Sequence, residues 1–449
     1  MADRPTLASV ATRKRAGKAL RGAVPRSLHA HWRPSRKGRD AVALLKATDR
    51  GRIPRLVPIR YGRMLHSPFA FLRGAAAVMA ADLARTSVSG LRVQACGDAH
   101  LMNFGGFATP ERHLIFDVND FDETLPAPWE WDVKRLAASV FVAARHLKLA
   151  QPRCAEATRA AVAAYRDSMA LYAPMSTLER WYQRIDATEI AELGLKAKKR
   201  LGAEAPPHPV TAHLFPKVTE AVGDSRRFKE APPLIFHPRK GDHTIDHVRR
   251  LLDRYRKSLP DDRRSLLERY ALADVVIKVV GVGSVGTRCA VALLMARDDD
   301  PLFLQFKEAR VSVLEPYAAR SRYRNHGERV VEGQRLMQSA SDLFLGWGHA
   351  EDPRADFYVR QLRDHKTSAD VEVMDFRHLL DYAHHCGRAL ARAHAKAGDA
   401  AAISGYLGKG GAFDGAIVRF AAAYADQTEA DFAALERAAK AGVIPVEDG

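Results

Sequence analysis

The chain has 449 residues, of which 47% are hydrophobic and 27% are charged, and its formal net charge at pH 7 is +17. Such a length predicts two or three domains or lobes, and the composition is ordinary for a soluble globular protein. No run approaches the roughly 20 apolar residues that a membrane helix needs, so a membrane span is not expected.

The cysteines and the N-terminus point to a reducing compartment. The four cysteines are widely spaced and form no CxxC pair, which argues against a structural zinc site and a disulfide framework. The N-terminus lacks the charged-then-apolar order of a secretory signal. We therefore expect a cytoplasmic protein.

Positive charge is concentrated at the start of the chain, in a basic N-terminal arm that we assign to residues 1–54. Its first 40 residues hold eleven Lys and Arg against two Asp. Such a segment could contact nucleic acid or an anionic membrane surface. A solvated basic arm is the simpler interpretation, and Trp32 is the one aromatic residue among the first 40, which weakens a stacking role.

Residues 55–202 are expected to form the first portion of a helical lobe. Ser67 is a predicted N-cap with Pro68 at the first helical position. Helical spacing of apolar residues begins again at Asp132 and helix continues to about residue 200. The sequence thus predicts an extended segment Leu56–Met64, a helix Ser67–Ala84 and two short strands, Leu91–Ala95 and His113–Val118.

Acidic and amide residues gather after each of these strands. Residues 97–105 read GDAHLMNFG, and residues 115–123 read IFDVNDFDE. Clustered Asp and Asn side chains offer hard oxygen ligands, which suit Mg²⁺, and a further Asp could act as a base. Turn-forming roles explain a lone Asp. The two motifs together hold five carboxylates and two Asn within 26 residues, which favours a functional site instead.

The spacing of these residues matches a kinase catalytic loop. Asp98 and Asn103 are five residues apart, as are the Asp that handles the substrate hydroxyl and the Asn that holds Mg²⁺ in kinases. Asp120-Phe121 follows after an apolar strand, where a kinase has Asp-Phe-Gly. This part of the chain resembles the aminoglycoside-phosphotransferase side of the kinase-like superfamily.

That resemblance implies roles for individual residues. Asp98 and His100 become catalytic candidates, although His100 could also be purely structural. Asp132, in the stretch PWEWDVKRLA, takes a structural position. The chain departs from the pattern at Cys96, where the family has His, and at Val133-Lys134-Arg135, which is interposed. The implied metal ligands are Asn103, Asp120, Asp122 and Asp117, and spacing does not decide among the three Asp residues.

A phosphate-binding loop and a strand lysine follow downstream of the catalytic loop. Residues 203–241 carry seven prolines and predict a linker. The segment 242–372 then reads as a strand-rich nucleotide-binding lobe. It holds GVGSVG, in which Gly281, Gly283, Ser284 and Gly286 would approach phosphates. A β-hairpin follows, with a first strand Cys289–Met295 and a second strand that leads to Lys307. A dinucleotide-binding fold is the rival, but it requires a helix after the third glycine.

The remaining segments complete a permuted arrangement. A helix after Asn325 would supply a glutamate to pair with Lys307, either Glu328 or, by a small preference, Glu332. Residues 373–449 form a helical tail that completes the helical lobe. The catalytic loop thus precedes the phosphate-binding lobe in the chain, which is the order of a circularly permuted kinase.

The whole layout also resembles the domain-of-unknown-function 2252 (DUF2252) family of bacterial proteins, over about residues 55–440. This resemblance implies a kinase-like fold and names no substrate. The stretches that carry it are RYGRM, SPFAFLRG, CGDAHLMNFG, NDFDE, WEWDVKR, GVGSVGT, VVEGQR and GYLG.

We therefore predict an α+β, protein-kinase-like fold of two lobes in circularly permuted order, and an ATP- and Mg²⁺-dependent phosphotransferase with an unidentified acceptor. Arg60, Arg63 and Arg73 could bind an anionic acceptor, or make ordinary ion pairs. Nucleotidyl transfer, a catalytically weak nucleotide-binding regulatory module, and a metal-dependent hydrolase that uses the Asp/His cluster alone stay open as alternatives.

Overall fold

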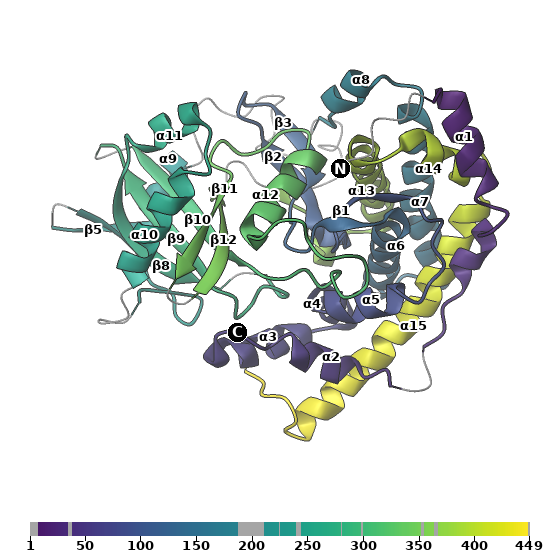
Figure 1. Cartoon of the computed structure of the whole chain (residues 1–449). Helices are drawn as coiled ribbons and strands as arrows, with labels where there is room; N and C mark the ends of the chain where they lie inside the picture. The colour runs from purple at the N-terminus through teal and green to yellow at the C-terminus, as the bar shows by residue number, and fades with distance from the viewer. Residues whose placement is uncertain are drawn as a thin grey trace.

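The structure is a computed structural model with a helical part and a strand-rich part side by side (Figure 1). Its fold class is α+β, as the sequence predicted. No helix among the described residues is long and apolar enough to cross a bilayer. The structure describes residues 8–34, 38–186, 211–223, 225–238, 244–279, 281–297, 300–351, 354–362 and 367–447.

The strand-rich part is built on a six-stranded antiparallel sheet in the order β11-β12-β10-β9-β8-β7. In α10, Val248, Leu251, Leu252 and Tyr255 recur at helical spacing, and all four are buried against the sheet. The strands are β7 (Ile235–Phe236), β8 (Ala271–Lys278), β9 (Cys289–Met295), β10 (Pro301–Ala309), β11 (Gly346–Glu351) and β12 (Arg354–Gln361). The helices are α9 (Thr211–Val218), α10 (Thr244–Arg256), α11 (Asp261–Leu267) and α12 (His326–Met337).

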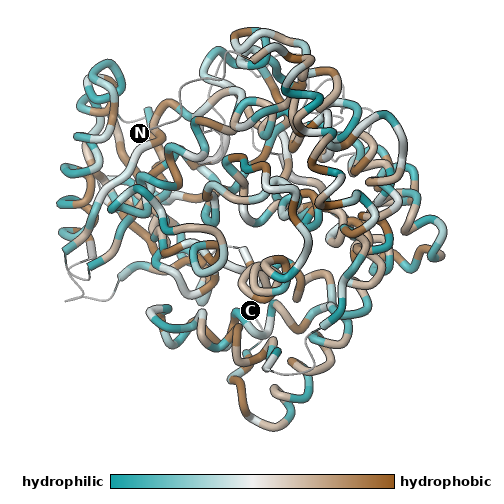
Figure 2. The backbone as a smooth tube through the Cα atoms, turned by 45° about the vertical axis from the view of Figure 1, so that its right-hand side comes forward, coloured by the Kyte–Doolittle hydropathy of each residue, from teal (hydrophilic) through white to brown (hydrophobic). Residues whose placement is uncertain are grey.

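The helical part draws on both ends of the chain. Helix α13 packs along α7, and a Cβ on Gly387 would lie 2.0 Å from the carbonyl oxygen of Ala161, so glycine permits this close contact. Hydrophobic and hydrophilic residues alternate along the helices, the pattern of amphipathic helices (Figure 2). The helices are α1 (Val10–Ala19), α2 (Ala41–Ala47), α3 (Val57–Met64), α4 (Pro68–Gly74), α5 (Ala76–Leu83), α6 (Trp129–His146), α7 (Gln151–Tyr172), α8 (Thr177–Tyr182), α13 (Phe376–Ala397), α14 (Ala400–Leu407) and α15 (Ala412–Lys440).

Small sheets at the junction carry the acidic motifs. Strand β1 (Arg92–Ala95) pairs with β4 (Leu125–Pro128), and β3 (Leu114–Val118) pairs with β2 (Phe104–Ala108). The two strands predicted before the motifs are confirmed, but they pair with β4 and β2 rather than with each other. A third strand, β13 (Thr367–Ser368), pairs with β2.

Three local predictions differ from the structure. Leu56–Met64 was expected to be extended, but it forms α3, with Pro58 in its first turn and Ile59, Tyr61 and Met64 buried. The predicted helix Ser67–Ala84 is broken at Ala75 into α4 and α5, although Ser67 caps it as expected by accepting a hydrogen bond from the Ala70 amide. In the predicted linker 203–241, residues 203–210, 224 and 239–241 lie outside the described residues. The rest contains α9, β7, β5 (Thr219–Val222) and β6 (Ser225–Phe228).

The basic arm is part of the fold in its described residues, 8–34 and 38–54, contrary to the simpler interpretation of a solvated segment. Helix α1 packs on α14, where a Cβ on Gly17 would lie 1.9 Å from the carbonyl oxygen of Ala402. Arg13 pairs with Asp399 at 3.0 Å. Arg21 and Arg26 donate hydrogen bonds to the carbonyl oxygens that end α14. Charges that suggested an external partner are thus used partly within the chain.

Candidate active site

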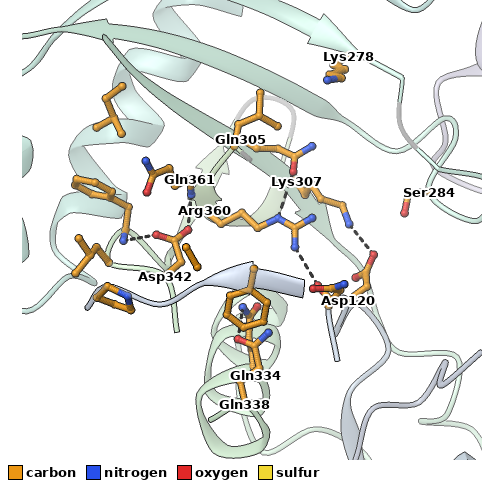
Figure 3. A pocket seen from close by; sticks show the side chains of 18 of the residues that line it. Asp120, Lys278, Ser284, Gln305, Lys307, Gln334, Gln338, Asp342, Arg360 and Gln361 are labelled. Carbon is orange, nitrogen blue, oxygen red and sulfur yellow. Dashed lines mark hydrogen bonds and ion pairs between the residues drawn. The ribbon is translucent and has the colours of Figure 1, made fainter. Parts of the chain in front are cut away.

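Lys307 lies beside the acidic motif that is far from it in sequence. It is on β10, and its Nζ lies 2.9 Å from Asp122 Oδ2. The same Nζ lies 3.3 Å from Asp120 Oδ2 (Figure 3). Burial disfavours the charge on this side chain, which is 3% exposed, but the two carboxylates outweigh it and raise the pKa of Lys307 well above its ordinary value. A cationic lysine therefore joins the two parts of the molecule at this point.

The two carboxylates have different environments. Asp122 accepts a hydrogen bond from the Tyr358 hydroxyl at 2.6 Å and one from Ser284 Oγ at 3.3 Å, in addition to Lys307. Its side chain is 26% exposed, against 39% for Asp120. Asp120 is therefore the carboxylate with more surface open to a ligand.

The backbone of the GDAH motif is held by Asp132, at the start of α6. Its carboxylate accepts hydrogen bonds from the amides of Cys96, at 2.6 Å, and Gly97, at 3.0 Å. His394 contacts the same carboxylate at 3.1 Å. Gly97 has φ +86°, and a Cβ there would lie 2.3 Å from the Glu123 carbonyl oxygen, so only glycine fits this turn. The structural position expected for Asp132 agrees with these contacts.

Asp98 has one oxygen held and one open. Arg135 donates from Nε at 2.9 Å to Oδ1, and its Nη2 lies 2.7 Å from the same atom. Oδ2 lies 3.8 Å from His100 Nε2. Burial lowers the pKa of His100 to about 4, so its imidazole is neutral at pH 7, and its Nδ1 has no hydrogen-bond partner among the described residues. Asp98 is thus oriented from one side and open to a hydroxyl on the other.

Asn103 ties the two acidic loops together. Its amide nitrogen donates to the carbonyl oxygens of Asp98 and Asp120, at 3.0 Å each. Its amide oxygen accepts no hydrogen bond from any residue that the structure describes. Asn103 therefore presents an oxygen to the same space as Asp120.

Asp117, which the sequence grouped with the metal ligands, lies elsewhere. It is fully buried within β3, and Arg392 pairs with both of its oxygens at 2.7 and 2.9 Å. The Ser339 amide also donates to it at 2.9 Å. Because this carboxylate is already neutralised and hydrogen-bonded in the core, Asp117 is removed from the candidate ligands.

The glycine loop connects β8 to β9 and lies over the acidic residues. The residues after it form β9 rather than a helix, so the dinucleotide-binding alternative is wrong and the predicted hairpin of β9 and β10 is confirmed. Gly281 and Gly286 have φ of +67° and +87°. Arg63 donates to the Gly281 carbonyl oxygen at 2.6 Å, and the Ile53 amide donates to that of Gly286 at 2.7 Å. The helical part thus holds the loop at both ends.

The predicted pair of Lys307 with Glu332 is absent from the described contacts. Glu332 pairs instead with Arg335, at 2.9 Å. Arg329 and Gly333, four residues apart on α12, face the acidic loop: Arg329 donates to the Thr124 and Asp122 carbonyl oxygens, and a Cβ on Gly333 would lie 2.4 Å from Thr124. Since one residue turns a helix by about 100°, Glu332 lies to one side of Gly333, and the partner of its carboxylate is Arg335. Glu328 is likewise not a partner of Lys307, whose contacts are Asp120 and Asp122.

Two adjoining cavities meet at Asn119, Asp120, Gly281 and Ser284. The larger cavity has a volume of about 680 Å³ and the smaller cavity about 430 Å³. The larger cavity is lined by residues that include Leu302, Gln305, Lys307, Phe344, Arg360 and Gln361 (Figure 3). The smaller cavity is lined by residues that include Arg73, Asp98, His100, Asn103, Asp122 and Glu123.

The oxygen ligands of the site are of the kind that could hold Mg²⁺ together with a nucleotide. The described residues contain no group of three or more His, Cys, Asp or Glu that could by itself hold a metal ion. Magnesium, however, commonly takes one or two carboxylates and completes its shell with substrate phosphates and water. The partly exposed carboxylate of Asp120 and the amide oxygen of Asn103, which both line the smaller cavity, fit that requirement.

Several residues of the site were not predicted. Arg135 orients Asp98, Tyr358 orients Asp122, and Arg360 donates to Gln305 and to the Asn119 carbonyl oxygen. The interposed Val-Lys-Arg in WEWDVKR was a signal for Arg135, because it departs from the aminoglycoside-phosphotransferase pattern directly after Asp132. Nothing in the local sequence of β12 marks Tyr358 or Arg360.

Comparison with known proteins identifies a family. Residues 52–438 match the model of the family described as "Uncharacterized protein conserved in bacteria (DUF2252)". No curated protein and no solved structure matches the chain.

Proposed function

We propose, from the premise that the chain belongs to the DUF2252 family, that it is an ATP- and Mg²⁺-dependent phosphotransferase with a kinase-like fold in circularly permuted order. The observation that carries this proposal is the contact of Lys307 with Asp120 and Asp122, across the junction of the glycine loop and the catalytic-type loop. Phosphoryl transfer requires mainly positioning and charge neutralisation, and these residues supply both.

The larger cavity would receive the nucleotide. Its wall combines apolar residues such as Leu302 and Phe344 with the amides of Gln305 and Gln361, which suits a base with polar edges. Lys307 and the glycine-loop amides would then contact the phosphates. Asp120 and Asn103 would hold Mg²⁺, which supplies positive charge against the β- and γ-phosphates.

The smaller cavity would receive the acceptor. Asp98, with Oδ2 open, accepts the proton of the acceptor hydroxyl as its oxygen forms a bond to the γ-phosphorus. The bond from the γ-phosphorus to the bridging oxygen breaks, and ADP leaves with that electron pair. Arg135 holds the Asp98 carboxylate in the orientation that this transfer needs.

The proposed use of ATP and the state of the cysteines both favour a cytoplasmic location. ATP is abundant in the cytoplasm, and the four cysteines are buried and unbonded, which fits a reducing compartment. We expect the protein to act there.

The test is nucleotide binding by calorimetry together with ATP turnover, for wild type, Lys307→Ala and Asp98→Ala. Lys307→Ala is expected to weaken Mg²⁺-dependent ATP binding by tenfold or more, on the order of 1.4 kcal/mol. Asp98→Ala is expected to bind ATP normally and to lose turnover by on the order of 100-fold. Lys257→Ala, an exposed lysine of the strand-rich part, is the control.

Two results would contradict the proposal. Absence of any Mg²⁺-dependent nucleotide binding excludes the phosphotransferase and every other nucleotide-dependent function. Full activity of Lys307→Ala favours instead a metal-dependent hydrolase that uses the Asp98 and His100 cluster without the lysine.

A further inference from the structure

The smaller cavity contains arginines that have no carboxylate partner. Four guanidinium groups line it, those of Arg52, Arg60, Arg73 and Arg310. Arg60 is paired with Asp49 at 2.6 Å and is 1% exposed. For the other three, no ion pair with a described residue exists. Of the three arginines that the sequence suggested for an anion, Arg60 is thus neutralised, Arg63 is used by the glycine loop, and Arg73 is available.

Arg73 is the least satisfied of these groups. Its guanidinium makes no side-chain hydrogen bond to any residue that the structure describes, and its Nε is buried without a partner. It lies 6.0 Å from the centre of the Phe69 ring. Burial lowers the pKa of Arg73, and the charge of Asp98 partly offsets this. The group therefore bears a cost of desolvation that an incoming anion would remove.

Arg73 stands beside the proposed catalytic residues. Its charge acts on His100, which shares the cavity wall with Asp98, and the Nδ1 of this neutral imidazole also lacks a partner. An anion held by Arg73 would therefore lie next to Asp98. Asp98 itself is compensated by Arg135, so its charge is a weaker obstacle to a neighbouring anion.

Arg52 and Arg310 add to the positive character of this end of the cavity. Arg52 donates to the carbonyl oxygens of Thr48 and Val285, and Arg310 donates to those of Thr48 and Arg50. Burial, and then the charges of Arg60 and Arg310, lower the pKa of Arg52 to about 9. An anion bound between these guanidinium groups would relieve their mutual repulsion.

We infer that the acceptor is a small hydroxylated molecule with a phosphate or carboxylate group, which Arg73 binds so that the hydroxyl lies at Asp98. The assignment of the hydroxyl rests on the proposed phosphotransferase function. The binding of the anion does not depend on it. A volume of about 430 Å³ lies in the range of small-molecule sites, so a small metabolite fits better than a macromolecular surface.

The test is calorimetric binding of inorganic phosphate, and separately of malonate, to the full-length protein without nucleotide and with a non-hydrolysable ATP analogue and Mg²⁺. Wild type is expected to bind at least one of the two anions at millimolar concentration in both conditions. Arg73→Gln is expected to weaken this binding at least about tenfold, and Arg73→Lys by less, because lysine keeps the charge and loses the fork of donors. The preferred anion identifies the acceptor group.

Arg153→Gln is the matched control. Arg153 also lies over a phenylalanine ring, that of Phe376 at 5.0 Å, but it is exposed and lines neither cavity. Thermal unfolding of Arg73→Gln should show no loss of stability, since the side chain makes no hydrogen bond to a described residue and bears a cost of desolvation.

The experiment distinguishes failure of the anion site from failure of the proposed phosphotransferase function. If neither anion binds wild type, or if binding is lost in Lys307→Ala and kept in Arg73→Gln, the anion site is refuted while ATP binding can still hold. If phosphate binding depends on Arg73 but no Mg²⁺-dependent nucleotide binding is measured, the anion site is supported and the phosphotransferase function is refuted.

Discussion

At the scale of single residues, the site depends on side chains that orient other side chains. Asp98 is oriented by Arg135, Asp122 by Tyr358, and the GDAH backbone by Asp132. Each orienting group comes from an element other than the one it orients. The chemistry proposed for Asp98 therefore depends on the packing of α6 as much as on the loop that carries it.

Arg135→Gln should separate this positioning role from nucleotide binding. The guanidinium holds Asp98 Oδ1 and also donates to the Leu72 carbonyl oxygen at 2.7 Å. Loss of an orienting partner typically costs about 10- to 100-fold in activity. We expect turnover to fall in that range while the affinity for ATP changes less than about twofold. Arg135→Lys should recover little, because one ammonium cannot reproduce the two-pronged contact. Equal losses of turnover and ATP affinity would contradict a positioning role.

Glu123 should make stability depend on pH. Burial raises the pKa of Glu123 from 4.5 to about 7, and its carboxylate accepts a hydrogen bond from the Val313 amide at 2.7 Å. Between these pH values the folded state binds the proton and the unfolded state does not, so stability falls as pH rises from about 4.5 to 7 and is level above that. We expect Glu123→Gln to remove this slope, which amounts to about 1–3 kcal/mol.

Urea unfolding of wild type and Glu123→Gln at several pH values measures the difference. Other titrating groups are common to both proteins and largely cancel. Parallel curves across this range would show that Glu123 titrates near its ordinary value.

At the scale of elements, α12 connects the strand-rich part to the acidic loop through direct contacts. Arg329 contacts the carbonyl oxygens of Asp122 and Thr124, and Gly333 packs directly on Thr124. Glycine within a helix costs about 1 kcal/mol relative to alanine. The chain accepts that cost at Gly333 because a side chain there would push α12 off the loop that holds Asp120 and Asp122.

Gly333→Ala should therefore destabilise, against the trend of helix propensity. The new Cβ would meet Thr124 Cγ2 at 2.4 Å and Oγ1 at 2.6 Å, and Thr124 is itself fixed by a hydrogen bond to the Ala95 carbonyl oxygen. We expect a loss of about 1–3 kcal/mol in the free energy of unfolding, together with reduced turnover.

Gly415→Ala is the matched control for this substitution. Gly415 is also helical, but its Cβ would meet only arginine side chains at 3.7 and 3.9 Å. It should be neutral or stabilising by up to about 1 kcal/mol. If the two variants are equally stable, close packing of α12 on the loop is not the reason for glycine at position 333.

At the scale of the whole molecule, local patterns were predictable and distant contacts were not. The hairpin of β9 and β10 and the N-cap at Ser67 follow from turn residues and alternation, which act over a few positions. The extended form expected for Leu56–Met64 was wrong because the packing of Tyr61 and Met64 in the core decided it. Asp117 and Arg392 are 275 positions apart in the sequence, and no local pattern in either segment predicts that they pair.

The same limit applies to charge. Composition shows an excess of Lys and Arg near the start of the chain, but it does not show which of them have partners inside the fold. Arg39 is the clearest case, because its guanidinium lies between Asp82 and Asp431, at 2.8 and 2.6 Å, with 8% of its side chain exposed. Arg39, which the sequence places within the basic arm, thus links α5 to α15 through two ion pairs.

Arg39→Met is expected to cost about 3–5 kcal/mol of the free energy of unfolding, since it leaves two buried carboxylates without a cation. Tyr424 donates to Asp82 at 3.0 Å and cannot replace the lost charge. If uncompensated charge is the cause, then Asp82→Asn and Asp431→Asn, each harmful alone, should recover part of the stability when combined with Arg39→Met. Denaturant unfolding of the triple variant and its components measures this. Additive losses, with no recovery, would show that the three residues contribute independently and that the ion pairs do not join the two ends of the chain.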